Sequence, residues 1–125
     1  MSMSASRDIV VAQSVSSNGH TYSEGALIQM AHGLRGRPVL SKEPRPEDSE
    51  DSTLQLACGI VIATEVLDGK VIVAVAWFEG KRPSEKYLTP TGTPVALKDA
   101  VITAYQPAHL TISGSSAFEE ATKLL

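Results

Sequence analysis

The distribution of apolar positions in the middle of the chain predicts a β-hairpin. Two largely apolar stretches, 54–67 and 70–78, flank Asp68-Gly69, a dipeptide typical of tight turns between antiparallel strands. If these two residues form the turn, Val66 faces Val71, and the register is set along both strands. One face is then bulky and is expected to join the core: Ile60, Ile62, Thr64, Val66, Val71, Val73, Val75 and Trp77. The other face is smaller and mixed, and suits close packing by a helix, sheet or second subunit: Val61, Ala63, Glu65, Leu67, Lys70, Ile72, Ala74 and Ala76.

Residues 23–36 carry a helical pattern instead. Four apolar residues recur at spacings of three and four and form one stripe: Leu27, Met30, Ala31 and Leu34. Ser23 can cap the first turn, and either Gly33 or Gly36 can take the left-handed conformation that ends a helix. Pro38 prevents continuation, so we expect a helix that ends before it.

Shorter patterns fill the rest of the chain. Residues 9–12 predict a first strand, and 86–88, 95–97, 100–105 and 109–112 predict further short strands. Residues 117–125 predict a short C-terminal helix capped by Ser116. The expected fold is mainly β (α+β): a small β-barrel or sandwich-like domain with a central two-stranded hairpin, one well-formed helix and the C-terminal helix. Residues 1–8 read as a flexible N-terminal arm, and residues 9–125 as one β-rich domain.

Composition narrows the functional classes. The chain has 125 residues and a net charge of −3, which argues against a nucleic-acid partner. No apolar stretch approaches the roughly 20 residues of a membrane helix, so no membrane partner is expected. The first residues have no apolar core typical of a signal peptide, and Cys58 is the one cysteine. These features are typical of a protein made in a reducing cytoplasm.

No motif indicates catalysis or a cofactor. Three widely separated histidines, His20, His32 and His109, match no zinc motif, and no serine lies in a nucleophile-elbow context. The acidic segment 41–53 reads as a solvated loop, with a cation site as the alternative because four of its residues are oxygen ligands: Glu47, Asp48, Glu50 and Asp51. We therefore predict no catalytic residue, no metal and no cofactor.

Two segments resemble the prohead proteases of tailed phages. Residues 21–39 resemble the opening of that family, where a helix precedes Gly-Lys-Pro-Val, here Gly36-Arg37-Pro38-Val39. Residues 59–63, the Asp68-Gly69 turn and residues 97–109 follow in the family's order, so the resemblance covers roughly residues 19–112. The family's catalytic histidine follows soon after the Pro-Val, but residues 40–44 contain none, and the nucleophilic serine falls at Val101. The resemblance therefore implies a phage protein without the family's active site.

These observations favour a non-enzymatic phage structural protein, a decoration or cement protein of the capsid. We expect it in the virion, bound to the major capsid protein or another virion subunit, and self-associated as a homo-oligomer. The candidate interface joins the arm to the second hairpin face: Ser2, Ser4, Ser6, Arg7, Ile72, Ala74 and Ala76. The alternatives are a β-rich module that binds an unknown ligand, and a peptidase whose active site is rearranged around His20 or His109 and another serine.

Overall fold

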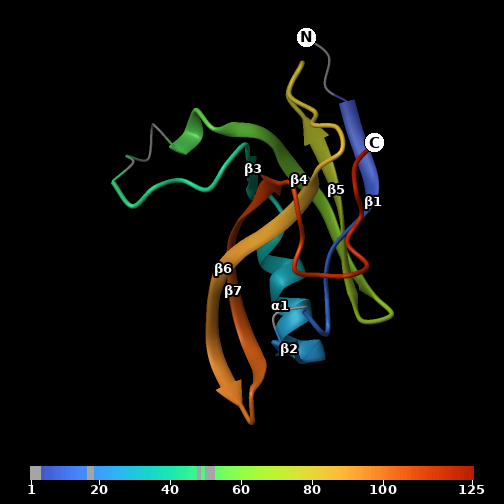
Figure 1. Cartoon of the computed structure of the whole chain (residues 1–125), viewed down its shortest axis with the longest axis vertical. Helices are drawn as coiled ribbons and strands as arrows, with labels where there is room; N and C mark the ends of the chain where they lie inside the picture. The colour runs from blue at the N-terminus through green and yellow to red at the C-terminus, as the bar shows by residue number, and fades with distance from the viewer. Residues whose placement is uncertain (1–3, 17–18, 48, 50–52) are drawn as a thin grey trace.

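The computed structural model describes residues 4–16, 19–47, 49 and 53–125. These residues form a seven-stranded sheet and the helix α1 (Glu24–Leu34). The strands are β1 (Ser4–Gln13), β2 (Thr21–Tyr22), β3 (Pro38–Leu40), β4 (Ala57–Leu67), β5 (Lys70–Trp77), β6 (Tyr87–Lys98) and β7 (Val101–Ser113). Their order is β1-β5-β4-β3-β7-β2, with β6 on β7, and the sheet curls into a half-barrel (Figure 1). The predicted β-rich α+β fold is confirmed.

The helix matches its sequence pattern closely. Ser23 is the N-cap, and its Oγ accepts a hydrogen bond from the Ala26 amide at 3.1 Å. The predicted apolar stripe is buried against β7, β4 and β5. Gly36, at φ +83°, takes the left-handed conformation after the helix. Gly33 has a different role, because a Cβ there would lie 2.5 Å from Pro107 of β7. The absent side chain lets the helix pack closely against β7.

The central hairpin has the predicted turn but not the predicted register throughout. Val66 pairs with Val71, and the two residues of the turn, Asp68 and Gly69, both have positive φ. Between Val61 and Ala63 the register shifts, because Ile62 is an extra residue in β4. A bulge of this kind reverses the inside-outside alternation beyond it.

The bulge corrects part of the predicted core. Val61 is buried in place of its neighbours, whereas Ile60 and Ile62 are 38% and 44% exposed. On β5 the predicted alternation is confirmed, since four core positions are buried: Val71, Val73, Val75 and Trp77.

The strands after the hairpin are longer than their sequence patterns predict. The four short strands are parts of β6 and β7, which form one long antiparallel hairpin (Figure 1). Its turn holds Asp99 and Ala100 at φ +53° and +66°. Pro90 and Pro94 lie in β6, which pairs with β7 alone, so they occupy an edge strand as expected of proline.

Both ends of the described chain differ from prediction. The first strand begins at Ser4, and Ser4, Ala5 and Ser6 pair with β5, so residues 4–8 are not a free arm. Residues 1–3 lie outside the described residues. The predicted C-terminal helix is wrong, because residues 117–125 form an irregular segment along β1 and the start of β6. The amide of Thr122 donates to Val10, and Leu124 pairs with Lys86.

Candidate interaction site

The outward side of β4 and β5 is apolar. Because the inner side chains of β5 fill the core, its alternate residues face outward and are half-buried among their neighbours. The exposed isoleucines that precede and form the β4 bulge continue this surface. We call the following residues the outer face: Ile60, Ile62, Ile72, Ala74 and Ala76.

The outer face is hollowed beside Ala74 by two bulges. On one side, Arg7 and Asp8 of β1 both lie opposite Ala74, since Ser6 pairs with Val75 and Ile9 with Val73. On the other side, the β4 bulge occurs between the partners of Val75 and Ala74. Asp8 has φ +58°, a left-handed conformation that an aspartate in a bulge can adopt. Bulges bend a strand and redirect its side chains, and here both neighbours of β5 bulge at one level.

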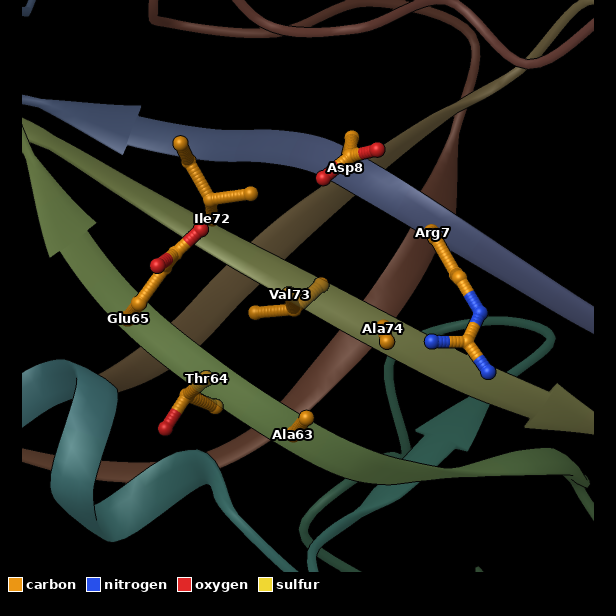
Figure 2. A pocket seen from close by; sticks show the side chains of 8 residues that line it. All are labelled: Arg7, Asp8, Ala63, Thr64, Glu65, Ile72, Val73 and Ala74. Carbon is orange, nitrogen blue, oxygen red and sulfur yellow. The ribbon is translucent and has the colours of Figure 1, made fainter.

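The result is a shallow depression of about 210 Å³. Figure 2 shows it between β1 and β4, with β5 crossing its floor. Arg7 extends from β1 toward Ala74, and the Glu65 carboxylate reaches toward Ile72. The floor is apolar, and charges of both signs lie at its rim. This arrangement suits an apolar side chain of a partner that is flanked by polar groups.

The structure gathers some predicted interface residues and separates others. Arg7, Ile72 and Ala74 line the depression together, and Ala76 lies two residues further along β5. Ser6 has a structural partner, because its Oγ accepts a hydrogen bond from Trp77 Nε1 at 2.9 Å. Ser4 is exposed and pairs with Trp77 across the strands, and Ser2 lies outside the described residues.

Sequence reasoning missed Ile60 and Ile62 as surface residues. Strict alternation from the Asp68-Gly69 turn assigns both to the core, because it allows for no extra residue at Ile62. The signal that was present is Gly59, where a Cβ would lie 2.6 Å from the carbonyl oxygen of Ala76. A glycine within a strand often indicates a bulge or a close backbone approach.

A polar cluster lies elsewhere, where the acidic loop meets the β6–β7 hairpin. One oxygen of Glu43, Oε2, accepts hydrogen bonds from Thr111 at 3.0 Å and Thr91 at 3.1 Å, and lies 3.1 Å from His109 Nε2. Burial alone raises the pKa of Glu43, but the hydrogen bonds from His109, Thr111 and Thr91, with the charge of His109, outweigh it. The net effect lowers the pKa of the Glu43 carboxyl below its usual value of 4.5.

This cluster resembles part of a catalytic triad but has a different connectivity. A carboxylate beside a histidine orients a catalytic base, which must also reach a nucleophile. Among the described residues, no serine, threonine or cysteine side chain hydrogen-bonds to His109, and both threonine hydroxyls contact Glu43.

The positions matched to the phage protease family are also far apart. Leu40, at the start of the segment where the family's histidine falls, pairs with Thr111 of β7. Val101 begins the same strand ten residues earlier, which corresponds to roughly 30 Å of extended chain. The structure therefore does not bring these two positions together.

Three further features concern metal binding, membrane insertion and the cysteine. Within the described ranges, no three His, Cys, Asp or Glu side chains are placed to hold a metal ion, and no helix is long and apolar enough to span a bilayer. Three of the four proposed cation ligands, Asp48, Glu50 and Asp51, lie outside those ranges. Cys58 is buried, and burial raises the pKa of its thiol despite the nearby Lys81.

Comparisons of the chain with protein-family models, curated proteins and solved structures find no match. The observations that bear on function are therefore the geometry of the outer face and the chemistry of the residues around it.

Proposed function

We propose that the protein is a non-enzymatic structural subunit of a phage particle, a decoration or cement protein that binds the capsid shell through its outer face. The observation that carries the proposal is the apolar depression at Ala74, where β1 and β4 bulge on either side of β5. The resemblance of residues 19–112 to phage head proteases supports the choice of partner.

The outer face fits a protein partner better than a small substrate. The depression is small and open, whereas pockets for small molecules usually enclose most of their ligand. Ile60 and Ile62 expose large aliphatic side chains beside it, and apolar patches of this kind mark protein interfaces. Arg7 and Glu65 at the rim can hydrogen-bond to a partner and set its orientation.

Co-sedimentation with capsid shells tests the proposal. Shells would be assembled from the major capsid protein encoded in the same genome and mixed with the purified chain. We expect the wild type to saturate the shells, and Ala74→Glu or Ile62→Asp to reduce occupancy at least about tenfold, because each places a charge in an apolar contact.

Val95→Asp is the matched control. Val95 is 63% exposed on β6, away from the outer face, so this change should leave occupancy as in the wild type. Circular dichroism and thermal melting would verify that each variant folds. A wild-type chain that does not bind shells, or outer-face variants that bind normally, would refute the proposal. Proteolysis of the capsid precursor that is lost in His109→Ala would refute its non-enzymatic part.

A further inference from the structure

The strand β4 has an unpaired edge beyond its bulge. β5 pairs with β4 up to the turn, but on the other side β3 pairs with it only as far as Ile60. Arg37 extends that contact by one residue, since its carbonyl oxygen accepts a hydrogen bond from the amide of Val61. Among the described strands, none pairs with residues 62–67 on this side. An unpaired strand edge presents backbone donors and acceptors that can bind another chain.

The backbone groups that this edge presents belong to Thr64 and Val66. In an antiparallel pair, successive residues turn their N–H and C=O groups alternately toward the partner strand and away from it. A two-residue turn is closed by a hydrogen-bonded pair, here Leu67 and Lys70, so the groups of Thr64 and Val66 point away from β5. Two donors and two acceptors therefore face the space beside β4.

That space is a groove between β4 and α1. The groove has a volume of about 320 Å³ and is lined by residues 64–66 of β4 and by one stripe of the helix, Glu24, Ile28 and His32, with Ala31 beside it. The helix is the teal ribbon at the lower left of Figure 2, where it lies beside β4 at Thr64. Ile28 is a large aliphatic residue that remains 48% exposed, so the helix wall of the groove offers apolar contact to a partner.

Carboxylates stand at the rim of the groove. Glu24 and Glu65 are both exposed, and within the described part of the chain neither forms an ion pair. No lysine or arginine is among the described residues that line the groove. Alternation along β4 turns Glu65 outward and Thr64 toward α1 (Figure 2). An added strand would therefore place one set of alternate side chains against apolar surface and the other set beside a carboxylate.

We infer that the groove between α1 and β4 binds an extended segment of a partner protein as an added antiparallel strand, in which aliphatic residues alternate with lysine or arginine. The segment runs antiparallel because β3 and β5 both pair with β4 in that direction. Its aliphatic side chains lie against Ile28, and its cationic side chains lie beside Glu65. Backbone hydrogen bonds supply affinity and the alternate side chains supply specificity. This site goes beyond the shell contact at Ala74 and does not depend on it.

Fluorescence anisotropy with a labelled synthetic peptide tests the inference. The probe has the sequence Gly-Lys-Val-Lys-Val-Lys-Gly, and we expect saturable binding to the wild type. Serine in place of both valines should weaken binding at least about tenfold, because charge alone remains. N-methylation of the valine amides should abolish binding, since the residues opposite Thr64 and Val66 turn their N–H groups toward β4. N-methylation of the central lysine amide, which faces away, should leave binding unchanged.

Two variants of the protein locate the site. Ile28→Lys places a cation in the groove and should weaken binding of the peptide at least about tenfold. Val95→Lys is the matched control, because it makes the same change of charge at a 63% exposed aliphatic residue of β6, outside the groove. Circular dichroism would verify that both variants fold.

Hydrogen exchange measured by NMR tests the backbone pairing directly. The amides of Thr64 and Val66 should exchange at least about tenfold more slowly when the peptide is bound, whereas the amide of Glu65, which faces β5, should change little.

Four results would overturn the inference. They are a wild type that does not bind the peptide, equal binding of the two N-methylated peptides, unchanged exchange at Thr64 and Val66, and normal binding by Ile28→Lys. Binding that is lost equally in Val95→Lys would indicate net charge rather than the groove, and would overturn it as well.

Discussion

At the residue scale, Ser6 shows how one small side chain supports the half-barrel. Trp77 is fully buried, and its indole N–H has Ser6 Oγ as its partner at 2.9 Å. Ser6→Ala removes that acceptor, and an unsatisfied buried donor costs about 1–3 kcal/mol. Urea unfolding followed by the emission of Trp77, the one tryptophan in the chain, measures the loss. Ser4→Ala is the control, because Ser4 is exposed, and should change stability by less than about 0.5 kcal/mol. Equal stability of the two variants would contradict the role of Ser6.

Glu43 makes the stability of the fold depend on pH. Its pKa is lowered in the folded state, so its hydrogen bonds stabilise the fold above pH 4.5, the usual value, and this stabilisation disappears as pH falls through the lowered pKa. Glu43→Gln should therefore lower the melting temperature at pH 7, and the difference from wild type should shrink below pH 4.5. Melting curves between pH 7 and pH 3 provide the measurement. Glu47→Gln, in the same loop but exposed and paired with Arg45, should show little pH-dependent difference. Parallel curves for Glu43→Gln and wild type would exclude this role.

At the element scale, the β4 bulge decides which side chains support the core. Val61 is 1% exposed, whereas the larger Ile62 is 44% exposed. Val61→Ala should cost about 2 kcal/mol, for two buried carbons and a residual cavity, whereas Ile62→Ala should cost less than about 1 kcal/mol. The same denaturation assay distinguishes them. The reverse order would mean that β4 pairs in the unbroken register expected from the sequence.

Local signals explain which elements were predictable. The helix has a capping serine and a regular apolar stripe, and Asp68-Gly69 is a turn sequence, so the sequence predicted the helix with its N-cap and the turn with the pair Val66–Val71. The second hairpin turn contains Ala100 at positive φ, where alanine gives no signal, and the β6–β7 hairpin was therefore divided into short strands. Ile60 and Ile62 were missed as surface residues for a related reason, since Gly59 is a weak signal of the β4 bulge.

The C-terminal segment illustrates tertiary contacts that override a local preference. A nine-residue helix is marginal without packing, and here the backbone finds partners in β1 and beside β6. Phe118 and Leu124 are both buried, and a spacing of six residues would place them on different sides of a helix. An irregular chain buries both, which a pattern of apolar residues alone does not reveal.

At the scale of the whole molecule, the two chain ends close one side of the half-barrel. The amide of Val10 donates to Thr122 Oγ1 at 2.8 Å, and the amide of Thr122 donates back to Val10. Leu124 connects the same segment to Lys86, beside the start of β6. The edge of β1 that faces away from β5 is thus partly covered, which limits uncontrolled strand pairing with other chains.

This closure changes the expected result of an N-terminal deletion. A free arm could be removed without loss of stability, but residues 4–6 pair with β5 and Ser6 contacts Trp77. We therefore expect deletion of residues 2–8 to lower the melting temperature and to shift Trp77 emission to longer wavelength, since Trp77 would meet water. Deletion of residues 2 and 3 alone is the control. If the longer deletion left stability unchanged, residues 4–8 would be a free arm, as the sequence predicts. If the longer deletion destabilises as expected, reduced shell binding by that variant would reflect both folding and contact, so substitutions on the outer face are the sharper test of attachment.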